Sequence, residues 1–143
     1  MRICSFLPSA TEIVYALGLG ADLHGVSHEC DYPHDALTKA HVVRSRFDPS
    51  EMTSAEIDQT VTDLMSRGEP IYEIDLDVLK SAKPDLVITQ ELCEVCAVSF
   101  EDVQDAVVQL DTPPQVISLD PHSLDDVLQT IRQVGEYTGE TAR

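Results

Sequence analysis

Residues 86–99 read LVITQELCEVCAVS, and this stretch decides the fold that the sequence predicts. Leu86–Thr89 is a short apolar, β-branched run, which is typical of a buried strand. Ser99 opens a helix, and the loop before it carries Cys93 and Cys96 as a C-x-x-C pair. In α/β proteins, ligands bind where strands end and loops turn towards helices. We therefore interpret the other segments by what each of them brings to this edge.

Strand–helix alternation continues along the whole chain. It predicts one α/β domain, residues 1–143, with a Rossmann-like, mainly parallel sheet flanked by helices. Four loops should converge on one edge of this sheet: 7–11, 27–33, 89–97 and 120–123. We further expect the sheet order to bring the second and third of these loops next to each other.

Polar residues predict where helices begin. Ser9 with Glu12, and Thr53 with Glu56, have the spacing of capping boxes. Two helices should also bury an apolar face. The residues of these faces are Ile57, Val61, Leu64 and Met65 in the first helix, and Leu124, Val127, Leu128, Ile131 and Val134 in the second.

The net charge is -17, from 26 acidic and 9 basic residues among 143. Such a chain would be repelled by nucleic acids and by anionic membranes, so we expect neither as a partner. An acidic surface with few lysines suits a salt-rich, halophilic cytosol, where ions screen self-repulsion. No segment has the ~20 apolar residues of a membrane span. The first residues lack the pattern of a signal peptide or lipid anchor, which predicts a cytoplasmic chain with reduced cysteines.

Two of the converging loops carry metal-ligating side chains. They are His28, Cys30, Cys93 and Cys96, a Cys3His set that suits zinc or an iron–sulfur centre if the loops meet. The alternative is that the cysteines are small side chains packing a ligand cleft. The C-x-x-C pair could also be a redox dithiol, although the neighbouring glutamates would raise the thiol pKa values and oppose it. No nucleophile elbow, Walker loop or dinucleotide fingerprint is present, so the sequence does not favour an enzyme.

Arg44 and Arg46 follow a predicted strand at 42–43. They could form an anion site at the sheet edge. The alternative is surface ion pairs with Asp48 or Glu51.

Four segments resemble a known family. They are RICSFLPSATEIVYALGLG (2–20), GVSHECDYP (25–33), KPDLVITQELCEVCAVS (83–99) and QVISLDPHSLDDVLQTIRQVGE (115–136). Together they are similar to the N-terminal lobe of the cobalamin- and iron-chelate-binding proteins of ABC importers, which have a helical backbone between two lobes. The cobalamin-binding branch is the nearest match. HEC and LCEVCAVS resemble a subgroup without an export signal, whereas the family is usually extracytoplasmic.

The resemblance implies a ligand cleft between two lobes, of which residues 1–143 would supply one. It implies that the cleft is lined by Pro8, Ser9, Tyr32 and the loop from Gln90 to Ala97 with Cys93 and Cys96, and that His28, Arg44 and Arg46 lie near it. It also implies that Glu12 or a neighbour docks on the permease of an ABC transporter.

The leading hypothesis is therefore a binding protein for cobalamin, a related corrinoid or an iron chelate, without catalysis. A cytosolic zinc or iron–sulfur protein is the second hypothesis, and a thiol redox protein is the third. A lobe without its partner should leave apolar surface exposed near residues 123–137 and the loops that line the cleft. This exposed surface could drive formation of a homodimer.

Low salt should destabilise this chain, because 17 uncompensated negative charges repel one another unless ions screen them. We expect the melting temperature to rise as sodium chloride is increased. A melting temperature that stays flat or falls over the same range would contradict the expectation.

Overall fold

The computed structural model describes residues 1–91 and 97–140, and there it confirms the predicted α/β class. The strands are β1 (Ile3–Ser5), β2 (Leu23–Ser27), β3 (His41–Ser45), β4 (Tyr72–Ile74), β5 (Leu86–Thr89) and β6 (Gln115–Ser118). The helices are α1 (Pro8–Ala16), α2 (Ser54–Ser66), α3 (Leu76–Ala82), α4 (Phe100–Val107) and α5 (Leu124–Thr138), with short 3₁₀ turns η1 (Gly20–Asp22) and η2 (His34–Thr38). None of the helices in these ranges is long and apolar enough to cross a membrane.

The six strands form one sheet in the order β4-β3-β2-β1-β5-β6. All neighbouring pairs are parallel except β3 and β4, which are antiparallel. The carboxyl ends of β1, β2, β3, β5 and β6 therefore lie at the same edge of the sheet, which we call the carboxyl edge. Because β4 runs the opposite way, it begins at this edge.

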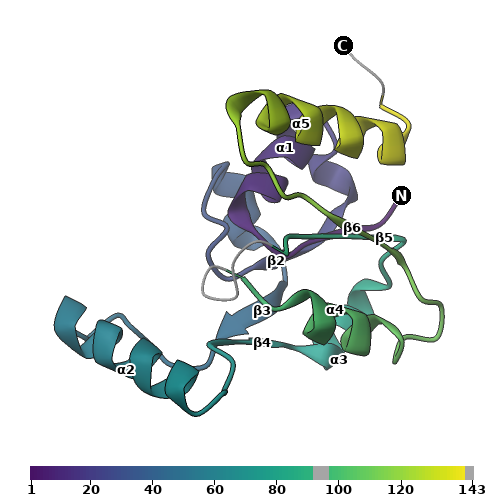
Figure 1. Ribbon diagram of the computed structural model, residues 1–143. Helices are drawn as coiled ribbons and strands as arrows, with labels where there is room; N and C mark the ends of the chain where they lie inside the picture. The colour runs from purple at the N-terminus through teal and green to yellow at the C-terminus, as the bar shows by residue number, and fades with distance from the viewer. Residues whose placement is uncertain (92–96, 141–143) are drawn as a thin grey trace.

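Helices cover both faces of the sheet, α1 and α5 on one side and α3 and α4 on the other (Figure 1). Side chains alternate between the two faces along each strand. Ile3 packs with Val14 of α1 in one buried cluster, whereas Cys4 packs with Leu79 and Val103 in the other. Burial of each Val, Leu or Ile contributes roughly 1.5–3 kcal/mol. The two clusters thus stabilise the sheet and the helices packed on it, which position the loops at the carboxyl edge.

Of the two predicted capping boxes, the structure contains one and not the other. The capping box that begins α2 is confirmed, because Glu56 N donates to Thr53 Oγ1 (3.3 Å) and Thr53 N donates to Glu56 Oε2 (2.7 Å). The capping box at Ser9 and Glu12 is wrong, because α1 begins at Pro8 and its N-cap, Leu7, provides no side-chain bond. Proline suits the first helical position, since its φ is preset and it has no N–H to satisfy.

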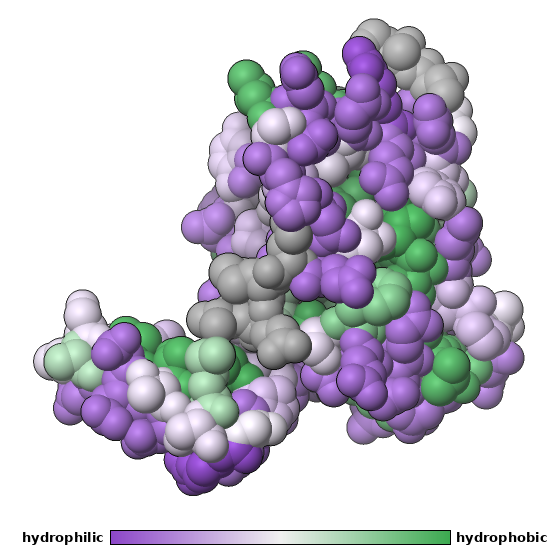
Figure 2. Space-filling model, in the orientation of Figure 1, coloured by the Kyte–Doolittle hydropathy of each residue, from purple (hydrophilic) through white to green (hydrophobic). Residues whose placement is uncertain are grey.

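Helix α2 stands apart from the rest of the molecule in Figure 1, and Figure 2 shows an open notch between it and the body. None of its residues is buried, so the predicted buried stripe is wrong. Ile57, Val61 and Leu64 are half-exposed, and Met65 is 50% exposed. The spacing of these residues correctly predicts an amphipathic helix, but the helix does not belong to either buried cluster.

Gly25 in β2 lies where the sheet tolerates no side chain. A Cβ atom at this position would lie 2.6 Å from Val42 Cγ1 and 2.9 Å from Cys4 Sγ. We expect Gly25→Ala to lower the free energy of unfolding by about 1–3 kcal/mol, because it overpacks a buried site. Urea denaturation measures this change, with Thr62→Ala on exposed α2 as the control. Equal stability of the two variants would contradict the packing argument.

Candidate functional site

A broad hollow opens beside the carboxyl edge, between α1, the turn after β2 and α5. Its volume is about 840 Å³, and its lining residues are Pro8, Ser9, Glu12, Ile13, Tyr15, Ala16, Tyr32, Pro33 and Val127. Tyr32 is 66% exposed, so its aromatic ring is available to a ligand. The sequence-predicted residues Pro8, Ser9 and Tyr32 are therefore brought together, and Glu12 lies beside them on α1.

Tyr15 supports one wall of the hollow. Its hydroxyl donates to Asp35 Oδ2 (2.6 Å), and Lys39 Nζ lies 3.5 Å from the same carboxylate oxygen. Partial burial and the bond to Asp35 raise the pKa of Tyr15 to about 12, so it stays a neutral donor at physiological pH. Gly20 leaves room for this ring, because a Cβ there would lie 2.4 Å from Tyr15 Cε1. These contacts hold η2, which follows the Tyr32–Pro33 turn, against α1.

A buried chain of hydroxyl and thiol groups joins the two loops behind the hollow. Ser5 Oγ donates to Leu7 O (2.9 Å), and Thr11 Oγ1 lies 2.9 Å from Ser5 Oγ and 3.1 Å from Cys30 Sγ. Because a hydroxyl has one proton, Thr11 donates to only one of these partners at a time, and the other contact needs a proton from its partner. Burial raises the pKa of the Cys30 thiol, which keeps that proton in place. This series of hydrogen bonds holds the turn that contains Cys30 against the start of α1.

Asp120 joins the ends of β5 and β6 at the same edge. Its Oδ1 accepts from Glu91 N (2.7 Å), and its Oδ2 accepts from Ser118 Oγ (2.6 Å). In addition, Leu119 N donates to Thr89 O (2.9 Å). The segment that leaves β5 is therefore anchored up to Glu91. The predicted ligand residue Gln90 is half-buried within this anchored segment.

Two residues of the Cys3His hypothesis, His28 and Cys30, lie in the described part of the chain. Cys93 and Cys96 lie outside the described residues. Cys30 is buried against Thr11, while His28 Nδ1 lies 3.2 Å from Val43 O and its ring lies 5.7 Å from that of Tyr72. The described part of the chain contains no group of three His, Cys, Asp or Glu side chains that could hold a metal ion.

The loops of the two cysteine motifs follow β2 and β5, which end at the same edge. The sheet order nevertheless places β1 between these strands. The strands before the two loops are therefore not neighbours, while the proximity of the loops themselves stays a prediction, since Cys93 and Cys96 lie outside the described residues.

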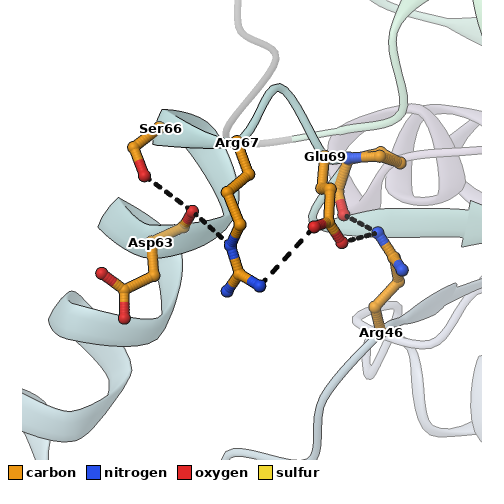
Figure 3. A network of polar contacts seen from close by, with 6 residues as sticks. Arg46, Asp63, Ser66, Arg67 and Glu69 are labelled. Atoms are coloured by element: carbon orange, nitrogen blue, oxygen red, sulfur yellow. Dashed lines mark hydrogen bonds and ion pairs between the residues drawn. The ribbon is translucent and has the colours of Figure 1, made fainter.

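Both predicted arginines have acidic partners. Arg44 lies 3.2 Å from Asp75, and Arg46 lies 3.3 Å from Glu69 and donates to Pro70 O (3.2 Å; Figure 3). Ion pairing was one of the two interpretations of the sequence, but the expected partners Asp48 and Glu51 are not the ones found. Asp75 and Glu69 flank β4, and the antiparallel pairing of β4 with β3 was not visible in the sequence.

Five lining residues of the hollow were missed by the sequence analysis: Ile13, Tyr15, Ala16, Pro33 and Val127. Val127, Leu124 and Leu128 were all expected to face inward. They are instead 41%, 78% and 50% exposed. Bare apolar surface near residues 123–137 is, on the other hand, what a lobe without its partner was expected to show. The pairing of Tyr15 with Asp35 joins residues 20 positions apart, so no local pattern could have revealed it.

No protein-family model matches the sequence, and neither does any curated protein. Solved structures do match. The haem-binding periplasmic protein RhuT of Roseiflexus sp. RS-1 is 25% identical with a TM-score of 0.65, over 97% of this chain and 41% of that one. A candidate iron-binding, periplasmic solute-binding protein of Staphylococcus epidermidis ATCC 12228 is 26% identical with a TM-score of 0.64, over 97% and 42%. The vitamin B12-binding protein BtuF of Vibrio cholerae is 24% identical with a TM-score of 0.62, over 95% and 40%.

The fold and the hollow at its strand ends are those of an α/β ligand-binding lobe. The matches at 25% and 26% identity support the resemblance to periplasmic binding proteins for haem and iron, and the match to the vitamin B12-binding protein, at 24%, shows the same fold. This chain spans about 41% of the length of the first of these proteins.

The buried thiols should be chemically inert in the folded protein. Burial raises the pKa of Cys4 to about 12 and also raises that of Cys30, so both remain protonated at pH 8. We expect iodoacetamide to alkylate them more than about 100-fold more slowly in the native chain than in urea, since the thiolate is the nucleophile. Peptide mass spectrometry follows each site separately. Similar native and denatured rates at Cys30 would contradict its placement in the buried chain.

Proposed function

We propose that this chain is one wall of a binding site for a flat metal chelate, and that it acts within a substrate-binding protein of the ABC-importer type without catalysing a reaction. The single observation that supports this most is the hollow beside the carboxyl edge, lined by Pro8, Ser9 and exposed Tyr32. Open sheets of this class bind ligands in the crevice at the carboxyl ends of their strands. The similar solved structures are of haem-, B12- and iron-binding proteins.

Charge favours a corrinoid over haem as the ligand. The hollow carries the carboxylate of Glu12, and the carboxylate of Asp35 lies just behind it. Arg44 on β3 and Arg46, which follows β3, are already paired with acids. Haem brings two propionates, which would meet this negative field, whereas most side arms of a corrinoid are neutral amides. Neutral arms can accept from Tyr32 or from backbone N–H groups at the start of α1 without charge repulsion.

The proposal includes a partner. Glu12 is exposed on α1 and is our candidate for docking on an ABC permease, through pairing with basic residues of that partner. Binding sites usually bury roughly 70–90% of a small ligand's surface, which one wall cannot achieve. We therefore propose that a second lobe completes the site.

Titration with cyanocobalamin and with haem tests the ligand proposal. Residues 1–143 alone should bind cyanocobalamin weakly, and a longer version with the connecting helix and second lobe should bind it far more tightly, because closure adds contacts and expels water. Tight binding by the 143-residue monomer would show that one lobe suffices. No binding of either compound by the longer version would overturn the proposal, and tighter binding of haem would overturn the choice of a corrinoid.

A substitution tests the position of the ligand. In the longer version, Tyr32→Ala should weaken binding about tenfold, equivalent to about 1.4 kcal/mol, because it removes the exposed ring from the hollow. Tyr137→Ala is the matched control, since Tyr137 lies on α5, is 40% exposed and does not line the hollow. Equal affinities of the two variants, measured by absorbance titration, would place the ligand elsewhere.

A further inference from the structure

Helix α2 and its connections form an arm that is rooted at the carboxyl edge. The arm leaves β3 after Ser45 and returns to β4 at Tyr72, and both of these strand ends lie at that edge. Helix α2 has 13 residues, so it extends about 20 Å. Its C-terminal end is at the root, because Arg67 caps the helix next to the return to β4. Figure 1 shows the arm projecting outward from the sheet edge.

A polar network at the root holds the direction of the arm. Glu69 accepts from Arg46 (3.3 Å), which follows β3, and its other oxygen lies 3.7 Å from Arg67 at the end of α2 (Figure 3). Arg67 Nε also donates to Asp63 O (3.1 Å), and Arg46 donates to Pro70 O (3.2 Å). Single surface ion pairs contribute only about 0–1 kcal/mol, but one carboxylate that joins two arginines and two backbone segments limits the angles the arm can adopt.

In the described part of the chain, the apolar stripe of the arm, defined as Ile57, Val61, Leu64 and Met65, is only partly covered: the first three side chains are half-buried and Met65 is 50% exposed. A 13-residue helix is only marginally stable without tertiary contacts, so this stripe is a surface that gains from being covered. Figure 2 shows hydrophobic side chains along the margin of the arm that borders the notch. The polar residues Asp58, Thr62 and Asp63 are all exposed.

The stripe continues into the body of the molecule at the root. A depression of about 270 Å³ there has a mixed lining of apolar and polar residues: Met65, Gly68, Glu69, Pro70, Ile71, Tyr72, Ala97, Val98, Ser99 and Asp102. Val98 also belongs to one of the two buried clusters. The depression thus joins the exposed Met65 of the arm to the carboxyl edge, the edge on which the proposed chelate site lies.

Two occupants of this surface can be compared. A second copy of the chain would bring another charge of -17 against the first, which opposes association except at high salt. A largely neutral, apolar chelate has no such cost. The loop after β1 lies three strand spacings from β4, about 14 Å, which a corrinoid macrocycle with its side arms can span.

We propose that the α2 arm is a side wall of the chelate site, with the apolar stripe lying against the macrocycle of a ligand held at the carboxyl edge. This inference rests on the proposed function and adds a binding element to it. The hollow at Tyr32 contacts one end of the ligand, and Val61, Leu64 and Met65 contact the other. The arm thereby replaces part of the enclosure that a single lobe lacks.

Methionine methyl groups provide a direct test. The chain has three methionines, Met1, Met52 and Met65, so ¹³C-methyl labelling gives three assignable NMR signals. A macrocycle beside the stripe should shift the Met65 methyl strongly through its ring current when zinc protoporphyrin IX or cyanocobalamin is added. Met1 is the internal reference, because it is bound to Asp22 at the opposite end of β1 and should not move.

A pair of matched variants gives the second readout. Val61→Glu places a charge in the stripe and should weaken binding of cyanocobalamin at least tenfold. Thr62→Glu adds the same charge one residue further on, on the exposed polar side, and should leave binding unchanged. Since neither residue is buried, both variants should fold, and circular dichroism verifies this.

The outcomes separate the two proposals. If neither compound binds to wild-type protein, with or without a second lobe, the proposed function fails and this inference fails with it. If a compound binds while the Met65 methyl does not move and the two variants bind equally, the side-wall role alone is overturned. Sedimentation that shows a dimer dissociated by Val61→Glu, with unchanged ligand affinity, would also overturn it and assign the stripe to a second copy.

Discussion

Parallel pairing of β1 with both β2 and β5 is the constraint on which the rest of this molecule depends. It places the start of α1, the Tyr32 turn and the segment anchored by Asp120 at one edge of the sheet. The buried contact of Thr11 with Ser5 and Cys30 then fixes two of these segments against each other. Residues that are far apart in sequence become neighbours because the strands that precede them run side by side, and the caps and ion pairs only refine their positions.

Because of this arrangement, the buried core and the exposed apolar surface lie in different parts of the molecule. Two apolar clusters on opposite faces of the sheet contain the fully buried side chains, including Phe6, Leu79 and Ile88, and supply the stability. The larger exposed apolar side chains include Tyr32, Leu124 and Met65, and they lie on the turn, on α5 and on the arm. Under the proposed function, the apolar side chains that stabilise the fold and those that would contact a ligand are therefore two different sets.

Local features of this fold could be predicted from the sequence, and non-local ones could not. The box of Thr53 with Glu56 depends only on spacing within one turn and was predicted correctly. Ser9 with Glu12 has the same spacing, but Pro8 moves the start of the helix and removes Ser9 from the capping position. Pro8, Ser9 and Tyr32 were placed together because of a family resemblance. Tyr15 was missed, since its partner Asp35 comes from a turn whose position only the folded chain defines.

Helix α2 shows why an amphipathic pattern defines a face but not the partner of that face. Its period of 3.6 residues requires Ile57, Val61 and Leu64 to share one side, and this is what the structure contains. Whether that side is buried depends on where the two ends of the helix are attached. Here the two connections of the arm leave from and return to the carboxyl edge, and Glu69 joins Arg46 to Arg67 at the C-terminal end of the helix, so the helix is directed away from both core clusters. In the side-wall role proposed above, this face contacts a ligand at the carboxyl edge, which accounts for its absence from both core clusters.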